Sequence, residues 1–349
     1  MLISLPSLND ELSAQLTEIV DNLPTPPELP QVWHYAAFLS ILSLDSATVS
    51  RMASKWVPDD HASTTDCELI LDSLNHPDLP PSILSVYTTL VQVWRYNSFG
   101  HHTDSNALCM YDITSNMSHS CAASAVWHFG DLDGFCLRAR TNLVPGDEVS
   151  ISYLGDEDLF RSVPARRVIT AGWLFECACD RCSLPCDFSR AFRCTVCCVG
   201  SIFATHCTTC NSFAASLEEQ IKLEALYIDR VLAIDKTDYE DISLVLSESL
   251  NLFTEYHWIV YFLKSYLPST ILSLSDRIAF QTRTFSQINY ATAWLVEELG
   301  DLLVKSGDTV EAAKQYERSY WMLRVLCGSD HPFTDGIQTK WQDIAVDKS

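Results

Sequence analysis

Apolar residues recur at the spacing of one helix face near the start of the chain. Four of them mark a first predicted helix: Leu12, Leu16, Ile19 and Val20. Prolines at residues 24–27 break this pattern, and residues 32–44 predict a second apolar helix. The prolines at 80–81 stand where the first turn of a helix accepts proline, and residues 83–94 predict a third helix. The pattern therefore predicts a helical region over residues 1–100.

The pattern changes after Gly100. Four short runs with strand character predict strands: 106–111, 125–129, 135–139 and 148–153. Turn residues separate these runs. Asp-Leu-Asp-Gly at 131–134 predicts a hairpin, and Val-Pro-Gly-Asp at 144–147 predicts a type II-like turn. The middle of the chain is therefore expected to form a small β domain.

Helical spacing returns in the last third of the chain. Three segments carry apolar residues every three or four positions: 215–232, 242–253 and 291–304. A further helix begins after Gly307, which predicts a helix-turn-helix pair. In that pair the small Ala312 and Ala313 allow close packing, while Tyr316 and Tyr320 fill the facing groove. The pair could be one unit of a helical repeat, or the region could be a plain helical bundle. In either case we expect it to bind a partner or to close one side of a substrate cleft.

The composition describes a globular protein with a strong negative charge. With 349 residues, 47% of them hydrophobic, the chain is long enough for two or three compact domains. Its formal net charge of -22 argues against direct nucleic-acid binding, because phosphate binding needs concentrated lysine and arginine. Basic protein tails would be attracted to such a surface. The longest apolar run, residues 258–263, is far shorter than the roughly 20 residues of a membrane span.

Cysteine carries the clearest chemical pattern. Nine of the 14 cysteines lie between Cys177 and Cys210. Residues 1–10 show neither a basic start nor an apolar run, so no secretory signal peptide is indicated. Metal-bound thiolates in a reducing compartment are therefore favoured over disulfides, and the nucleus or the cytoplasm is the expected location.

Two groups of cysteines have the spacing of zinc ligands. Cys177-Ala-Cys179-Asp-Arg-Cys182 offers three thiolates in one turn, and Cys121 is the candidate for the fourth ligand. The second group has two C-x-x-C knuckles typical of a zinc ribbon: Cys194, Cys197, Cys207 and Cys210. Cys198 could compete there, and Cys186 or His206 could substitute. Little positive charge surrounds this ribbon, which favours a structural role over nucleic-acid binding.

Four motifs, taken in order, resemble one protein family. They are Asn116-Met-Ser118-His119-Ser120-Cys121, Leu137-Arg138-Ala139, Pro145-Gly-Asp-Glu-Val-Ser-Ile-Ser-Tyr153 and Trp173-Leu-Phe175-Glu-Cys177-Ala-Cys179-Asp-Arg-Cys182. Together they resemble the C-terminal half of a SET domain followed by its post-SET zinc site. Among SET proteins the chain is most similar to the SET and MYND family of protein-lysine methyltransferases, over roughly residues 95–345.

The resemblance implies an α+β fold in four parts. These are a helical region with the SET insert at 1–100, the C-terminal half of the SET domain at 101–175, the post-SET zinc site with a second zinc ribbon at 176–212, and a helical TPR-like domain at 213–349. The first cysteine group would then hold a structural zinc, because four thiolates leave no position for bound water.

The resemblance also implies methyl transfer from S-adenosylmethionine to a lysine of a histone or another protein. Tyr153 matches the catalytic tyrosine, whose hydroxyl orients the amine; with a pKa of about 10 it is a poor general base. Ser118 and His119 stand where the family has an Asn and a His that contact the cofactor, and Phe175 matches the aromatic residue that stacks on adenine. Trp173 stands where a second tyrosine commonly borders the lysine channel. Substrates would be proteins with basic tails, and other partners would bind the TPR-like domain.

Two parts of that family are not found in this sequence. No G-x-G turn precedes residue 106, since Gly100 is the first glycine, and no cysteine- and histidine-rich MYND finger is present. A shortened chain and a divergent member that has lost methyl transfer would both explain this. Two functions therefore stand as expectations: an active methyltransferase, and a zinc-binding interaction scaffold without catalysis.

Overall fold

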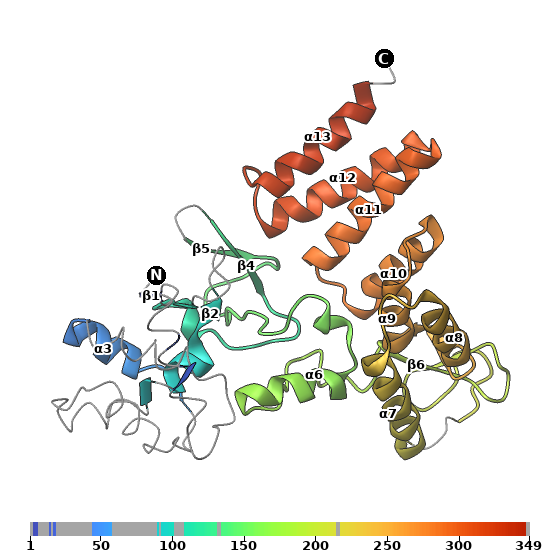
Figure 1. Cartoon of the computed structure of the whole chain (residues 1–349), viewed down its shortest axis with the longest axis horizontal. Helices are drawn as coiled ribbons and strands as arrows, with labels where there is room; N and C mark the ends of the chain where they lie inside the picture. The colour runs from blue at the N-terminus through green and yellow to red at the C-terminus, as the bar shows by residue number, and fades with distance from the viewer. Residues whose placement is uncertain are drawn as a thin grey trace. The chain divides into compact units, whose positions relative to one another are not determined.

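The protein is described by a computed structural model that covers residues 3–5, 14, 17–18, 44–57, 89–90, 92–100, 108–130, 134–213 and 217–346. It is an α+β chain with small antiparallel sheets and a C-terminal helical region (Figure 1). Two compact units divide it: one holds residues 1–118 and 128–136, and the other holds residues 119–127 and 137–349. The predicted α+β class is thus confirmed.

Several N-terminal predictions lie outside the described residues. These are the break at 24–27, residues 32–43 of the second helix, the prolines at 80–81 and residues 83–88 of the third helix. The described parts of the first and third helices are helical: residues 14, 17–18, 89–90 and 92–94.

The first unit contains a three-stranded antiparallel sheet. Its strand order is β1 (Ile3–Leu5), β3 (Leu108–Met110) and β2 (Phe99–Gly100). β3 confirms part of the strand predicted at 106–111. Helix α3 (Ser46–Ala53) begins at Asp45, whose carboxylate accepts a hydrogen bond from the Thr48 N–H. The buried apolar core of this unit comprises Met52, Leu90, Val93, Trp94 and Met110.

The predicted hairpin at 125–139 is confirmed. β4 (Ala125–Phe129) pairs with β5 (Phe135–Ala139), and the Gly130 N–H donates to the Gly134 carbonyl at 2.7 Å. The predicted turn at 144–147 is also confirmed. Its Asp147 N–H donates to the Val144 carbonyl, and Gly146 has a φ of +102°, the conformation that a type II turn requires at its third position.

The strand predicted at 148–153 is wrong. Within this segment the structure has a single parallel bridge, between Ile151 and His119. Two serine side chains replace the rest of a ladder: the Ser150 N–H donates to Ser124 Oγ at 3.0 Å, and the Ser124 N–H donates to Ser150 Oγ at 3.2 Å. Hydroxyls that satisfy backbone groups in this way compete with regular sheet pairing.

The second unit holds another small sheet, in the order β7, β6, β8. These strands are β7 (Ser201–Ile202), β6 (Arg190–Arg193) and β8 (Phe253–His257), all antiparallel. The helix predicted at 242–253 instead ends at Ser249. Phe253 is fully buried against the rings of Phe192 and Tyr227, so tertiary packing outweighs the local helical pattern there.

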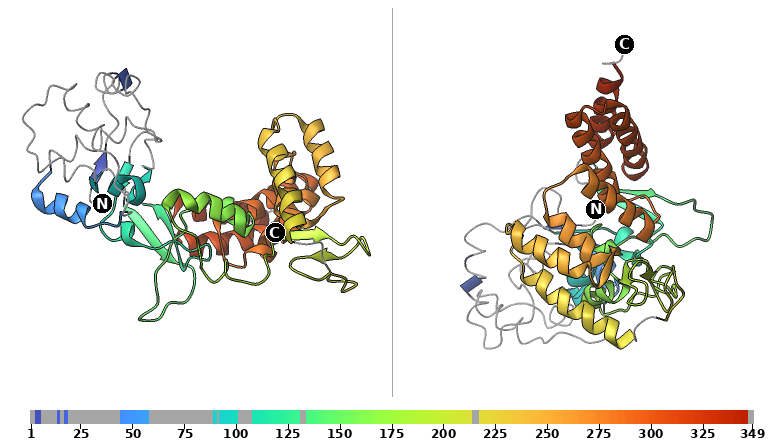
Figure 2. Two further views of the ribbon diagram at one scale, coloured as in Figure 1. Left: turned by 90° about the horizontal axis from the view of Figure 1, so that it is seen from below. Right: turned by 90° about the vertical axis from the view of Figure 1, so that its right-hand side faces the viewer.

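The remaining helices all lie in the second unit. They are α6 (Val163–Thr170), α7 (Leu217–Ala233), α8 (Tyr239–Ser249), α9 (Trp258–Tyr266), α10 (Ile271–Thr284), α11 (Tyr290–Ser306), α12 (Thr309–Leu326) and α13 (Pro332–Val346). Short 3-10 turns occur as η1 (Thr114–Asn116) in the first unit and as η3 (Asp158–Phe160) and η4 (Ala171–Trp173) in the second. Figure 2 shows α7 and α8 (yellow) as neighbours, and the Arg230–Glu248 ion pair joins them.

Within the described part of the chain, no helix combines the length and apolar character that a membrane span needs.

A buried carboxylate connects the small sheet to the helices. Glu224 on α7 accepts hydrogen bonds from the Arg190 guanidinium of β6 and from the Trp258 indole of α9, and the His257 ring lies 3.3 Å from its second oxygen. Burial alone would raise the Glu224 pKa, but the hydrogen bonds from His257 and Arg190 outweigh it and lower the pKa to about 2. Arg190 and Glu224 thus form a fully compensated buried ion pair.

The predicted helix-turn-helix pair is confirmed as α11 and α12, which pack side by side with α13 (Figure 1). Gly307 ends α11 in the left-handed conformation, and Asp308 caps the start of α12. The two helices approach closely at Gly300, where a Cβ would lie 2.5 Å from the Tyr316 ring. Tyr316 therefore fills the predicted groove.

Charged residues fasten this helical pair to the rest of the second unit. The Asp156 carboxylate accepts from the Tyr290 and Ala291 N–H groups at the start of α11, at 2.9 and 3.3 Å. Arg138 of β5 donates to the Val325 carbonyl at the end of α12, at 3.0 Å. Each charge has the sign that the helix dipole favours, an interaction typically worth about 0.3–1 kcal/mol.

Replacement of Gly300 tests the close approach of the two helices. Gly300→Ala is expected to lower the free energy of unfolding by about 1–3 kcal/mol, because the new methyl group displaces the Tyr316 ring. The matched control is Gly336→Ala on α13, where no atom lies within 4 Å of the added Cβ; it should raise stability by about 0.5–1 kcal/mol. Urea unfolding measures both. Equal effects of the two substitutions would contradict the packing described here.

Candidate metal centres and active site

The four cysteines of the first predicted group come together as one cluster, the first centre: Cys121, Cys177, Cys179 and Cys182. Their sulfur atoms all lie within 4.8 Å of one another, with Cys121 Sγ 3.6 Å from Cys182 Sγ and 3.9 Å from Cys177 Sγ. Zinc–sulfur bonds of about 2.3 Å in a tetrahedron require sulfur separations of about 3.8 Å. The donor set and its spacing therefore fit zinc.

Local structure explains how these sulfur atoms meet. Cys121 follows the backbone bridge at His119, and the other three cysteines follow η4 in a turn closed by the Ser183 N–H to the Cys179 carbonyl. Hydrogen bonds from the Cys121 and Cys182 thiols lower the pKa of Cys179. Thiolates are the form in which cysteine binds metal, so the group would release thiol protons when it takes up an ion.

The second predicted group also forms one cluster, the second centre: Cys194, Cys197, Cys207 and Cys210. Cys194 Sγ lies 3.7 Å from Cys210 Sγ, and Cys197 Sγ lies 3.6 Å from Cys207 Sγ. Backbone N–H groups of Val196, Gly200 and Thr209 donate to three of these sulfurs at 3.3–3.4 Å. This arrangement of two knuckles around β6 and β7 also fits zinc.

The competing ligands weighed for the second centre lie outside it. Cys198 is exposed, with a left-handed φ of +59°, and belongs to neither cluster. The His206 ring packs on Phe213, with centroids 4.3 Å apart, and its Nδ1 is paired with the Thr205 hydroxyl. Cys186 likewise belongs to neither group. Among the described residues, the four predicted cysteines are therefore the group that could hold a metal ion here.

Four aromatic residues gather beside the first centre. Ring centroids of Tyr153 and His119 are 5.3 Å apart, those of Tyr153 and Trp173 are 5.5 Å apart, and those of His119 and Phe175 are 5.7 Å apart. Each of these rings is partly exposed. The structure thus brings together Tyr153, His119, Trp173 and Phe175. Ser118 precedes His119 and is exposed.

His119 links the aromatic group to the first centre. Its Nδ1 accepts a hydrogen bond from the Tyr153 N–H at 2.9 Å, and its Nε2 lies 3.4 Å from Cys121 Sγ. Burial lowers the His119 pKa to about 4, so the ring is neutral and its proton sits on Nε2, facing the sulfur. Both ring nitrogens are therefore engaged within the chain, which leaves the backbone and the ring face for any cofactor contact.

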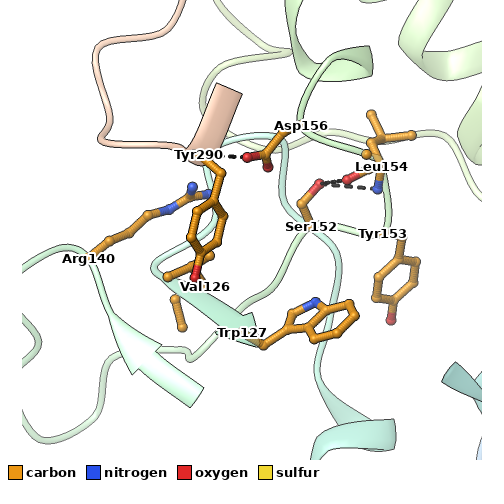
Figure 3. A pocket seen from close by; sticks show the side chains of 10 residues that line it. Val126, Trp127, Arg140, Ser152, Tyr153, Leu154, Asp156 and Tyr290 are labelled. Carbon is orange, nitrogen blue, oxygen red and sulfur yellow. Dashed lines mark hydrogen bonds between the residues drawn. The ribbon is translucent and has the colours of Figure 1, made fainter. Parts of the chain in front are cut away.

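A pocket of about 340 Å³ adjoins Tyr153 (Figure 3). It is lined by Ala125, Val126, Trp127, Arg140, Ser152, Tyr153, Leu154, Gly155, Asp156 and Tyr290. Figure 3 shows Asp156, Arg140 and Val126 around Tyr290, and Trp127 on the side toward Tyr153. Burial raises the pKa of Tyr153, so its hydroxyl remains protonated at neutral pH.

Sequence reasoning did not identify most of these pocket residues. Asp156 belongs to the acidic run Gly-Asp-Glu-Asp, which reads as a solvated loop, and Tyr290 looks like an ordinary helical apolar residue. Arg140 donates to the Ala123 and Ile288 carbonyls, and no local sequence pattern predicts these contacts. The Asp-Gly and Pro-Gly turns nearby were the only local signals that a folded site surrounds Tyr153.

No protein-family model matches the sequence, and no curated protein matches it. The function of the site therefore has to be argued from its residues and their geometry.

The two clusters predict the metal content of the chain. The purified protein should hold about two zinc ions, and Cys121→Ser and Cys207→Ser should each reduce this to about one, because each removes one ligand of a different tetrahedron. Elemental analysis of the purified variants measures it. Cys198→Ser is the matched control and should keep both ions. A wild-type content below one ion would contradict both assignments.

Proposed function

We propose that this chain is a SET-type protein-lysine methyltransferase of the SET and MYND family, using S-adenosylmethionine. The observation that carries the proposal is the grouping of His119, Tyr153, Trp173 and Phe175 beside the first centre. These residues are separated in the sequence, and each stands at the family motif position that implies a site role. The resemblance rested on their order and spacing in the sequence, and their grouping in space supports the same proposal.

The larger architecture is compatible with the same proposal. A hairpin, an irregular segment ending at Tyr153 and a cysteine turn precede two further zinc knuckles and a helical region, in the order that the resemblance implies. The helix-turn-helix of α11 and α12 is proposed as the TPR-like part. It would bind partner proteins, or the flanks of a substrate.

Phe175 and His119 form the proposed binding site for the cofactor. Phe175 has a partly exposed ring on which an adenine could stack, and His119 borders it with a ring face rather than a polar edge. S-adenosylmethionine, when bound, would supply an activated methyl group. The first centre would act by holding the Phe175 segment against His119, since Cys121 comes two residues after His119 and Cys177 two residues after Phe175.

Tyr153 is the proposed catalytic residue. Its phenol stays protonated, so its hydroxyl can orient a lysine amine by hydrogen bonding but cannot remove the proton. The apolar side chains that line the adjacent pocket would desolvate the amine and lower its pKa, favouring the neutral nucleophile. Attraction of basic tails, such as those of histones, follows from the charge of -22.

One observation favours the second candidate, a zinc-binding interaction scaffold without catalysis. Trp173 packs 5.5 Å from Tyr153, where the family commonly has a second tyrosine. An indole donates a hydrogen bond but has no oxygen to accept one. Trp173 therefore cannot supply a second hydroxyl beside Tyr153 to orient an amine.

Calorimetric titration of the zinc-loaded full chain with S-adenosylmethionine tests the proposal. We expect saturable binding that Phe175→Ala weakens about tenfold, the value of a lost aromatic stack of about 1.4 kcal/mol. Tyr153→Phe should retain this binding but lose methyl transfer to a lysine-rich peptide. Trp321→Ala, on a half-exposed ring of α12, is the control and should bind as wild type.

Absence of heat at millimolar cofactor, in protein shown to contain zinc, would reject the enzyme and favour the scaffold. Binding without methyl transfer in the wild type, restored by Trp173→Tyr, would identify Trp173 as the cause of inactivity.

A further inference from the structure

Arg166 on α6 is a fully buried guanidinium without a carboxylate partner. Its exposure is 0%, and it takes part in none of the ion pairs formed by the described residues. Both neighbouring arginines pair normally: Arg161 with Asp158 at 2.6 Å and Arg167 with Glu176 at 2.8 Å. An unpaired charge in the interior costs several kcal/mol, so other negative groups must compensate Arg166. Burial disfavours its charge, and the groups that act against burial are Cys121 and Cys182 and, more weakly, the Asp187 carboxylate.

The contacts of Arg166 identify one of these groups. Its Nη2 donates to Cys182 Sγ at 3.4 Å, its Nη1 donates to the Arg161 carbonyl, and its Nε has no hydrogen-bond partner among the described residues. The buried Arg190 of the same unit offers a comparison, because it has the Glu224 carboxylate. At Arg166 the cysteine sulfurs of the first centre take the place of a carboxylate.

A second guanidinium approaches the same centre from another side. Arg181 lies between Asp180 and Cys182 and donates to the Cys121 carbonyl at 3.5 Å and to the Leu159 carbonyl at 2.6 Å. It also packs on the Phe285 ring, 4.9 Å from its centroid. Like Arg166, it forms no ion pair with a carboxylate of the described residues.

The charges of these groups balance. Zinc with four thiolates carries a net charge of -2, and two guanidinium groups carry +2. We propose that Arg166 and Arg181 are the counter-charge of the first centre, and that they make it the slowly exchanging one of two zinc sites. The proposal concerns metal retention and does not depend on methyl transfer.

The second centre has less of this compensation, from one arginine that contacts a neighbouring carbonyl: Arg193 Nη1 donates to the Cys198 carbonyl at 3.0 Å. Its sulfurs receive hydrogen bonds from backbone N–H groups, and the Ser212 hydroxyl contacts Cys194 and Cys210 at 3.2 and 3.0 Å. No arginine or lysine of the described residues hydrogen-bonds to them, and Cys210 is exposed. The negative charge of this centre is met mainly by backbone N–H groups, a hydroxyl and solvent rather than by buried guanidinium groups, so its zinc should leave first.

Zinc release from the loaded full chain into excess EDTA, followed by native mass spectrometry, tests this difference. We expect two phases of about one ion each, and Cys207→Ser should remove the fast phase only. Arg166→Met should accelerate the slow phase about 10- to 100-fold, the usual effect of losing a group that supports a ligand. Arg166→Lys, which keeps the charge, should restore most of the retention.

Arg167→Met is the matched control, because Arg167 lies on the same helix but pairs with Glu176 at the surface. It should leave both phases unchanged. If Arg166→Met does not fold, Arg181→Met decides, with the same acceleration expected. A slow phase unchanged by the loss of either charge, or lost equally in Arg166→Lys, would overturn the proposal.

Discussion

Four sulfur atoms from two distant parts of the sequence share one small volume, and the geometry of the site follows from this. Cys121 precedes Cys177 by 56 residues, so the first centre closes a long loop at a considerable entropic cost. That loop contains β5, Tyr153 and the segment that carries Trp173 and Phe175. Metal binding would supply the free energy that keeps it closed, because binding of the ion and folding of its ligands are coupled.

A weaker set of interactions determines what surrounds Tyr153. α11 starts and α12 ends on the same side of their antiparallel pair, so one acidic and one basic group can serve both ends. Asp156 and Arg138 do this, while Arg140 holds two backbone carbonyls close to the pocket. The pocket therefore has a wall of groups already engaged with helix ends, which limits how far the helical pair can move away from it.

Local sequence patterns were sufficient where a few neighbouring residues decide the structure. The hairpin at 125–139 and the turn at 144–147 follow from alternation, Gly134 and Gly146, and the cysteine spacing indicated both metal clusters. Local sequence patterns were insufficient where residues that are distant in the sequence determine the structure. Ser124 replaces sheet pairing near Ser150, and burial against β6 turns Phe253 into a strand residue. The pocket joins four segments that are distant in the sequence: 125–127, 140, 152–156 and 290.

The separation of Cys121 from its partners also has a consequence during translation. At about 5–20 residues per second, the ribosome needs about 3–11 seconds to add the 56 residues up to Cys177. Until then the other cysteines of the first centre have not been made, so the Cys121 thiol cannot bind zinc with them and is open to oxidation. The second centre spans only 16 residues between Cys194 and Cys210 and is complete within about 1–3 seconds of its first cysteine. The Cys121 thiol of the nascent chain therefore has to stay reduced for several seconds before the first centre can form.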